Sequence, residues 1–181
     1  MASPAASPAS TRGASSPSAV AIGPCRTADL LVSVTNTEAA AGNVGGYLLF
    51  ENMTAEACTL RGTPTLTAVT VAGAATRARF AATVGTPFPS LTQPPLVILE
   101  PGDKAFAAYG GSDNSGSVTA TCPPPYHTFQ VTPPGNTISV DLPAFNAWLD
   151  QDQPSCAGIE VTVIAPASEV EQFNDLSSLR P

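Results

Sequence analysis

Charged residues are scarce in this sequence. Asp, Glu, Lys and Arg make up 12% of its 181 residues, whereas they make up about a quarter of an average soluble domain. Ser, Thr, Asn, Gln and Pro occupy the polar positions instead. Surface helices are usually built from Glu and Lys, and a proline inside a helix removes a hydrogen-bond donor. Scarce charge and 19 prolines therefore argue against a helical fold.

Basic residues are especially few. Seven Lys and Arg side chains stand against 14 Asp and Glu side chains, which gives a net charge of −7 at pH 7 and an isoelectric point near 4.4. The basic residues are scattered along the chain. Nucleic-acid phosphates and anionic lipid surfaces both require clustered cations. We therefore expect neither as a partner.

Long apolar runs are absent. No segment approaches the roughly 20 apolar residues that cross a bilayer, so no transmembrane helix is predicted. Residues 1–24 consist mainly of Ala, Ser and Pro, and Pro4, Pro8 and Pro17 interrupt every apolar stretch. We therefore interpret them as a disordered spacer and not as an intact signal peptide. If the protein is exported, its signal peptide is absent from this chain.

The four cysteines predict disulfides. No Cys-x-x-Cys pair occurs, and His127, the single histidine, offers little to complete a zinc site. An even number of widely spaced cysteines is typical of disulfides in an oxidising, exported setting. Of the three possible pairings, chain order favours Cys25–Cys58 with Cys122–Cys156. Each bridge would stabilise the fold by roughly 3–4 kcal/mol. The alternative is four buried free thiols in a cytosolic protein.

Alternating apolar and polar residues predict many short strands, with a turn signal about every ten residues. The central stretch is residues 46–64. Its apolar run 47–50 and its segment 58–60 are expected to form the two strands of a β-hairpin. A disulfide is expected to tether the second of these strands. A loop of small residues is expected over 37–45. Further strands are expected at 29–35, 64–71, 77–84, 96–99, 104–109, 117–122, 128–131, 137–142 and 158–165.

Proline and glycine mark the chain reversals. The segment 100–103, Glu-Pro-Gly-Asp, has turn chemistry because Pro presets the first central φ and Gly supplies a positive φ at the second. The segment 133–136, Pro-Pro-Gly-Asn, is expected to turn in the same way. Loops are expected at 86–95 and 110–116, and a short helix is expected at 143–150, where Pro stands at its start.

These elements predict an all-β fold. An immunoglobulin-like antiparallel β-sandwich with two disulfides is favoured over an up-and-down barrel, which would need more even strand lengths. The domain is expected to span residues 25–166, between the spacer 1–24 and a C-terminal tail, 167–181. A monomer is expected.

One stretch carries a family resemblance. Asn52, followed by residues 57–64 (Ala-Cys-Thr-Leu-Arg-Gly-Thr-Pro), is its most specific part, together with the four cysteines. Over residues 25–166 the chain resembles exported proteins and lipoproteins of actinobacteria that carry a domain of unknown function, numbered 4232. That family usually has an aromatic residue where Thr63 stands. The resemblance implies an immunoglobulin-like fold outside the cytoplasm, and it implies no reaction.

Catalytic and metal-binding residues are not expected. His127 is the only imidazole, and no Gly-x-Ser-x-Gly elbow accompanies it, so a surface histidine is predicted. Asp150 and Asp152 belong to a solvated turn rather than a calcium site, because Pro154 stands where a third ligand would be needed. The glycosylation pattern Asn52-Met53-Thr54 is interpreted as a coincidence. No cofactor is predicted.

Three aromatic residues are the candidate binding residues: Trp148, Tyr126 and Phe88. An exposed tryptophan can stack on a sugar or anchor a partner protein. The alternative is that Trp148 fills one end of the core, because a large apolar side chain normally lies inside.

The sequence therefore favours a non-catalytic exported domain of the cell envelope that binds an envelope protein or a glycan, located outside the cell or on its surface. Two alternatives stay open. One is an exported hydrolase that uses carboxylates, for which the acidic charge is the only motivation. The other is a purely structural surface spacer, which would have neither a cleft nor an exposed aromatic cluster.

Overall fold

The structure is a computed structural model that describes residues 21–40, 42–84, 90–114, 122–146, 151–153, 156 and 158–169. A short 3-10 helix, η1 (Thr27–Asp29), precedes the first strand. The strands are, in chain order, β1 (Leu30–Ala40), β2 (Asn43–Asn52), β3 (Cys58–Leu60), β4 (Thr65–Thr70), β5 (Ala75–Arg77), β6 (Arg79–Phe80), β7 (Val97–Leu99), β8 (Lys104–Ser112), β9 (Tyr126–Thr132), β10 (Val140–Pro143), β11 (Phe145–Asn146), β12 (Gln151–Asp152), β13 (Ile159–Val161) and β14 (Ala165–Pro166). The all-β prediction is confirmed.

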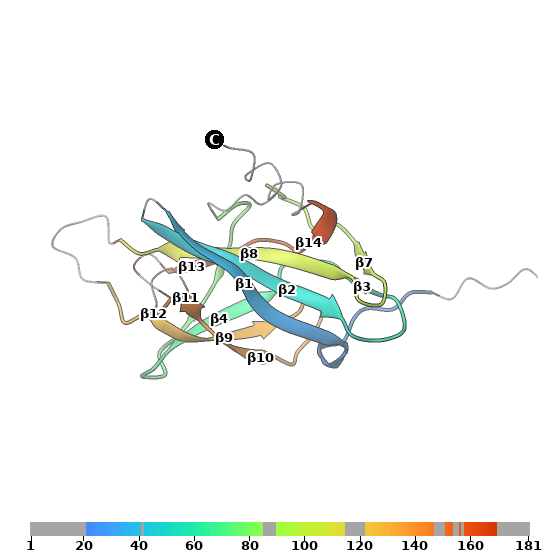
Figure 1. The fold of residues 1–181 in the computed structure, drawn as a ribbon, viewed down its shortest axis with the longest axis horizontal. Coiled ribbons are helices and arrows are strands. Elements are labelled where there is room, and N and C mark those ends of the chain that lie inside the picture. The colour runs from blue at the N-terminus through green and yellow to red at the C-terminus, as the bar shows by residue number, and fades with distance from the viewer. Residues whose placement is uncertain are drawn as a thin grey trace, which may run out of the picture.

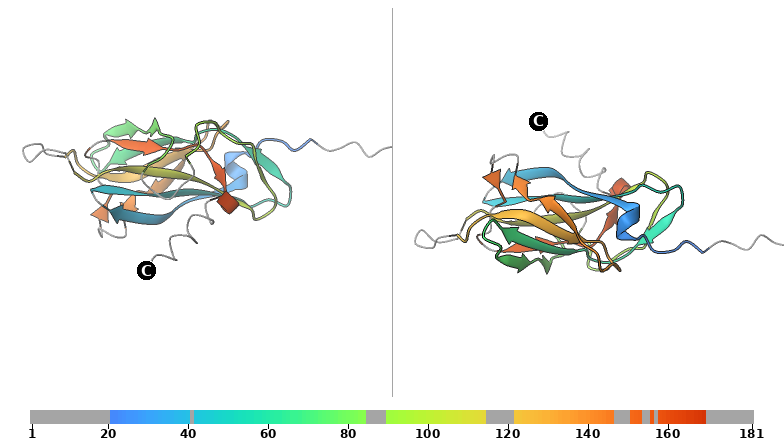
Figure 2. Two further views of the ribbon diagram at one scale, coloured as in Figure 1. Left: turned by 90° about the horizontal axis from the view of Figure 1, so that it is seen from above. Right: turned by 90° about the horizontal axis from the view of Figure 1, so that it is seen from below.

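Two larger sheets form two layers (Figures 1 and 2). The first sheet has the strand order β1-β2-β8-β13-β6, and β14 also pairs with β8. The second sheet has the order β10-β9-β4-β5, and two small sheets pair β3 with β7 and β11 with β12. These strands pair antiparallel, except that β13 pairs parallel with β6.

The core lies between the two large sheets. In β4, Leu66 and Ala68 are buried while Thr65 and Thr67 are partly exposed, as expected for a strand with one face inside. Tyr109 of β8 meets Phe129 of β9 edge-on, with ring centroids 5.0 Å apart. Because side chains alternate along a strand, the neighbours of Tyr109 in β8 face outward from the sandwich.

The outer face of the first sheet is partly covered by the connection between β6 and β7. Val84 and Leu91 from this connection pack against a small cluster that includes the buried residues Tyr47, Ala108 and Ala165. The described parts of this connection, 81–84 and 90–96, therefore lie against the outer face of the first sheet, and a groove is formed there.

Both predicted disulfides are present. Cys25 pairs with Cys58 and Cys122 pairs with Cys156, with Cα atoms 4.9 and 4.4 Å apart. The pairing favoured by chain order is thus confirmed.

The predicted hairpin between residues 47–50 and 58–60 is wrong. β2 pairs with β1 and β8, whereas β3 pairs with β7. The side-chain amide of Asn52, the last residue of β2, donates to the carbonyl oxygens of Glu56 and Leu99 at 2.8 and 3.0 Å. These bonds turn the chain away from the first sheet, so that β3 enters a separate small sheet and is tethered there by Cys58.

The loop predicted over 37–45 is also wrong. β1 and β2 continue through it as a long hairpin, with Gly42 at φ 80° beside the turn. Likewise, β8 runs on to Ser112, through the start of the loop predicted at 110–116. Small residues have low strand propensity, but here the pairing of β2 with β8 decides the structure.

Other expectations are mostly confirmed. Strands occupy the segments predicted at 29–35, 64–71, 96–99, 104–109 and 128–131. Gly102 and Gly135 supply positive φ angles of 82° and 75° in the two predicted turns. The strands predicted at 77–84, 137–142 and 158–165 are shorter or divided.

The helix predicted at 143–150 is wrong for residues 145–146, which form β11 and pair with β12. Residues 147–150 lie outside the described residues, as do 117–121 of a predicted strand, 1–20 of the spacer and 170–181 of the tail. No helix within the described ranges is long and apolar enough to cross a membrane.

Candidate functional site

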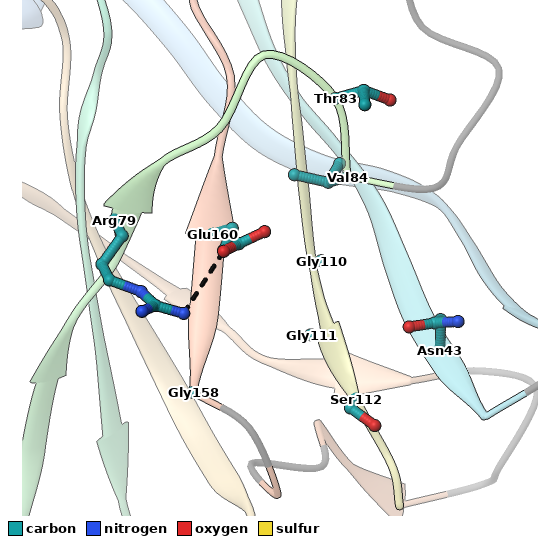
Figure 3. A pocket seen from close by; sticks show the side chains of 9 residues that line it. All are labelled: Asn43, Arg79, Thr83, Val84, Gly110, Gly111, Ser112, Gly158 and Glu160. Carbon is teal, nitrogen blue, oxygen red and sulfur yellow. Dashed lines mark hydrogen bonds and ion pairs between the residues drawn. The ribbon is translucent and has the colours of Figure 1, made fainter.

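A groove lies on the outer face of the first sheet, where the connection between β6 and β7 crosses it (Figure 3). Its volume is about 300 Å³. We call it the glycine groove, and its lining consists of Asn43, Arg79, Thr83, Val84, Gly110, Gly111, Ser112, Gly158 and Glu160. These residues come from β2, β6, β8, β13 and two connections, so the fold alone brings them together.

Two glycines of β8 allow close approach of other backbone segments, Gly110 on the outer face of the sheet and Gly111 on the opposite side, because side chains alternate along a strand. A Cβ atom on Gly110 would lie 2.9 Å from the carbonyl oxygen of Val84, and one on Gly111 would lie 2.6 Å from that of Gly158. No side chain could be accommodated at such distances without a shift of the backbone. Gly110 also pairs with Gly45 across β2 and β8. Gly45 and Gly110 therefore form a strip on the outer face that carries no side chains and is two strands wide.

An ion pair lies beside this strip. Arg79 of β6 and Glu160 of β13 are direct cross-strand neighbours, and Nη2 of the arginine is 3.3 Å from Oε1 of the glutamate. The side chains are 73% and 40% exposed. The structure shows this single long contact between them rather than the two parallel bonds that an arginine can make to a carboxylate. Much of the hydrogen-bonding capacity of both groups therefore faces the groove and the solvent.

The opposite rim is formed by the β1–β2 turn and the end of β8. The hydroxyl of Ser112 lies 2.9 Å from the carbonyl oxygen of Gly42 and accepts a bond from the backbone N–H of Asn114 at 3.1 Å. Ser112 thus fixes this rim. Asn43 and Thr83 are exposed, and Val84 adds an apolar wall.

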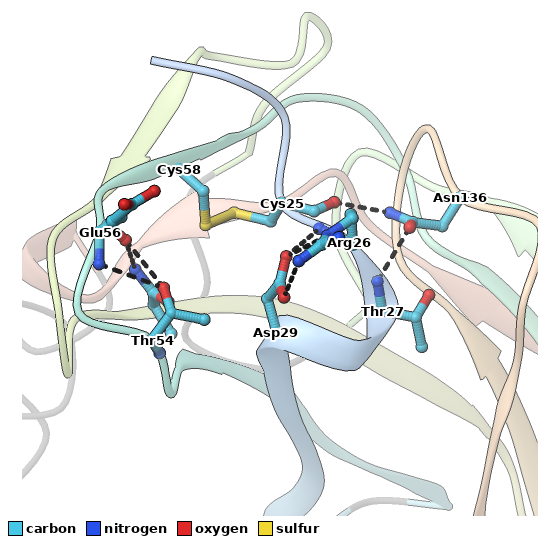
Figure 4. A network of polar contacts seen from close by, with 9 residues as sticks. Cys25, Arg26, Thr27, Asp29, Thr54, Glu56, Cys58 and Asn136 are labelled. Atoms are coloured by element: carbon cyan, nitrogen blue, oxygen red, sulfur yellow. Dashed lines mark hydrogen bonds and ion pairs between the residues drawn. A yellow bond between two sulfur atoms is a disulfide. The ribbon is translucent and has the colours of Figure 1, made fainter. Parts of the chain in front are cut away.

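A second cavity, of about 460 Å³, lies near the Cys25–Cys58 bridge and includes Arg26, Asp29 and Glu56 in its lining. Here the arginine and aspartate bind each other closely, with both bonds, Nε to Oδ2 and Nη2 to Oδ1, at 2.9 Å (Figure 4). The hydrogen bonds from Arg26 lower the pKa of the Asp29 carboxyl below its usual value. The hydrogen-bonding groups of Arg26 and Asp29 are thus used in their bonds to each other.

The same region is tied to the second sheet. The side chain of Asn136 accepts a hydrogen bond from the backbone N–H of Thr27 at 2.9 Å and donates one to the carbonyl oxygen of Cys25 at 3.0 Å (Figure 4). Asn136 belongs to the turn between β9 and β10. We therefore interpret this region as a clamp for the start of the domain, and the glycine groove as the candidate site.

Asn52 has a structural role. It is buried, and besides the two bonds that it donates, its Oδ1 accepts bonds from the backbone N–H and the hydroxyl of Thr54 at 3.0 and 2.8 Å. An amide with all these bonds is not presented for glycosylation. This network explains why Asn52 and the Cys58 segment stand out together in the sequence.

His127 is exposed, and its Nδ1 lies 3.0 Å from Oδ1 of Asp152. Tyr126 and Thr128 oppose Thr70 and Val69 of β4, so His127 is an extra residue, a β-bulge, in β9. The bulge aims the ring at β12, where Asp152 lies in a strand and not in the predicted turn. Bulges cannot be read from sequence periodicity, and this pair was not predicted. Among the described residues no group of three His, Cys, Asp or Glu could hold a metal ion.

The predicted aromatic binding residues are not brought together in the described part of the chain. Tyr126 is 3% exposed and belongs to the core, so its ring offers no surface to a ligand. Phe88 and Trp148 lie outside the described residues. Sequence reasoning also missed Gln153, which is 1% exposed and whose side-chain amide has no hydrogen-bond partner among the described residues.

Comparisons with known proteins identify a family for this chain, and they identify no activity. The family model described as "Domain of unknown function (DUF4232)" matches residues 25–165, which is most of the chain. No curated protein and no solved structure gives a significant match. The chain therefore belongs to the DUF4232 family, a family whose function is unknown.

Proposed function

We propose that this protein is an exported, non-catalytic binding module of the cell envelope and that the glycine groove contacts its ligand. The observation that carries the proposal is the groove itself, in which the exposed ion pair of Arg79 and Glu160 stands beside a floor without side chains. The two disulfides support export, because such bonds persist mainly outside the cytosol.

The lining of the groove favours binding over hydrolysis. Glycosidases that work with carboxylates need two of them at a defined separation, one on each side of the bond that breaks. Among the described residues of the lining, Glu160 is the only carboxylate, and it forms an ion pair with Arg79. A groove of this composition can position a ligand, and its described lining holds no second acid of the kind that the hydrolase alternative requires.

A purely structural spacer is the other alternative, and it predicts no cleft. The groove favours a binding role over that alternative. Its position also suits binding, because the outer face of a sheet is accessible without any rearrangement of the core.

The test compares capture of envelope components by the protein and by groove variants. Thr83→Trp should fill the groove from an exposed position, and Glu160→Gln should remove one charge while keeping the shape. The matched control is Glu51→Gln, because Glu51 forms an ion pair with Lys104, at 3.8 Å. This pair lies at the far end of β2 and β8, away from the ends of these strands that line the groove. Circular dichroism melts would establish that all variants fold.

We expect an envelope extract to yield a reproducible ligand for the wild-type protein and for Glu51→Gln, and not for the two groove variants. Capture that is equal for all four proteins would overturn the role of the groove. No capture by any of them would overturn the binding proposal.

A further inference from the structure

We propose that the ligand of the glycine groove is a neutral saccharide, bound through the hydroxyls of one or two sugar rings. This inference rests on the proposed binding function and adds the chemical class of the ligand. It follows from the charge, the hydrogen-bonding groups, the shape and the backbone pairing of the groove.

The charge of the groove favours an uncharged ligand. Arg79 and Glu160 contribute one positive and one negative charge, and no other lining residue that the structure describes is ionisable. An anion bound to Arg79 would lie beside the negative carboxylate of Glu160 and would approach a chain of net charge −7, both of which repel it. A cation would meet the guanidinium of Arg79, which is 73% exposed. A neutral ligand avoids both costs.

The hydrogen-bonding groups suit hydroxyls. A guanidinium only donates and a carboxylate only accepts, whereas each hydroxyl does both. Within the described part of the chain, Arg79 uses only Nη2, toward Oε1 of Glu160. Its other N–H groups can then donate to a ligand, and the second carboxylate oxygen can accept from one. Both groups are planar and fork-shaped, so each can bind two adjacent groups at once. Neighbouring hydroxyls on a sugar ring present this arrangement.

The shape suits a ring with an apolar face. The strip formed by Gly45 and Gly110 has no side chains, and Val84 stands over its edge. The C–H face of a sugar could lie on this strip while its hydroxyls reach the ion pair. The volume of about 300 Å³ is at the lower end of the range for small-ligand sites, about 300–1,000 Å³, which fits one or two rings better than a folded partner.

The backbone pairing argues against an extended peptide. Peptides that bind sheets usually add a strand to a free edge. The two strands under the floor of the groove, β8 and β13, have no such edge, because β8 pairs with β2 and β13, and β13 pairs with β8 and β6. β6, which ends the strand order, has only two residues. A peptide lying on this face would gain none of the regular main-chain hydrogen bonds.

The experiment uses an array of immobilised oligosaccharides, in which neutral chains are matched with chains carrying uronic acids and with chains carrying free amines. Wild-type protein, Glu160→Gln, Thr83→Trp and the control Glu51→Gln are applied at equal concentration. Hits are then titrated by calorimetry. We expect at least one neutral chain to bind, with affinity at least tenfold weaker for Glu160→Gln, lost for Thr83→Trp and within twofold of wild type for Glu51→Gln. Neutral-chain binding that both groove variants retain would overturn the site.

A second arm separates this inference from the proposed function. Envelope extract is treated with periodate, which cleaves adjacent diols, or with a protease, before capture. Loss of capture after periodate and not after protease supports the saccharide. Groove-dependent capture that survives periodate and fails after protease, or array binding to charged chains alone, overturns the saccharide and leaves the binding function standing. Absence of any groove-dependent capture overturns both.

Discussion

Gly46 and Tyr109 face each other across β2 and β8, and the tyrosine hydroxyl occupies the space that a side chain on the glycine would need. A Cβ atom on Gly46 would lie 3.0 Å from the tyrosine oxygen and 3.0 Å from the carbonyl oxygen of Thr35. The ring of Tyr109 packs against Phe129 of the other sheet. The glycine therefore lets a fully buried tyrosine link the two layers of the core.

Replacing Gly46 with alanine should destabilise the fold. The added methyl group must push aside a buried hydroxyl or a paired backbone carbonyl, and overpacking of this kind costs about 1–3 kcal/mol. Urea unfolding measures the change. Gly23→Ala is the matched control, because nothing lies within 4 Å of its Cβ position. Equal stability of the two variants would contradict the packing described here.

Tyr109 should stay protonated at unusually high pH. Burial raises its pKa to about 12, whereas the unfolded chain has the ordinary value of about 10. The stabilising contribution of the neutral group is therefore present below about pH 10 and is lost as the pH rises toward about 12, by an amount of about 3 kcal/mol. Ultraviolet titration of the phenolate measures it, with Tyr109→Phe as the control. A Tyr109 that ionises with an ordinary pKa would contradict the burial.

The ion pair of Arg26 and Asp29 should contribute to stability at neutral pH and should lose that contribution in acid. Hydrogen bonds from Arg26 lower the pKa of Asp29. A lowered pKa in the folded state means that the contribution is present above the ordinary pKa and disappears as the pH falls through the lowered one. Stability curves against pH should therefore be flatter in the acid range for Asp29→Asn than for the wild type. Identical acid limbs would show that the ion pair has no influence.

Gln153 should be replaceable with a gain in stability. Burying an amide without partners costs about 1–3 kcal/mol, and both amide atoms of Gln153 lack partners among the described residues. Gln153→Met keeps the length of the side chain and removes the polar atoms, so the free energy of unfolding should rise by about 1 kcal/mol. A fall of similar size would show that the amide is satisfied, for example by an ordered water molecule.

The sequence predicted the parts of this fold that depend on local pattern. The alternation over Thr65–Thr70 and the Pro-Gly turns at Gly102 and Gly135 follow from single residues and their neighbours. The even number of cysteines predicted both bridges. These predictions hold because each feature depends on a few neighbouring residues or on a covalent bond, and not on which strands pair.

Strand partners and the groove could not be predicted in the same way. β2 pairs with β8, whose residues are remote in the chain, and Arg79 meets Glu160 at a separation of 81 residues. No periodicity encodes such pairs. The paired glycines at 45–46 and 110–111 were a usable signal, because glycine inside a strand often marks a close approach of backbone or ligand. Gly45, Gly110 and Gly111 lie instead in segments for which loops are predicted, and Gly46 opens the stretch 46–64 for which a hairpin is predicted.

The most direct test of the binding account is a nuclear magnetic resonance titration of the isotope-labelled protein with the neutral oligosaccharide that binds best on the array. Glycine amides resonate apart from most others and serve as reporters. We predict that the signals of Gly110, Gly111 and Gly158 shift, that those of Gly102 and Gly135 stay in place, and that Thr83→Trp abolishes the shifts. Shifts confined to other residues, or none at a saturating concentration, would contradict the claim that the glycine groove binds a saccharide.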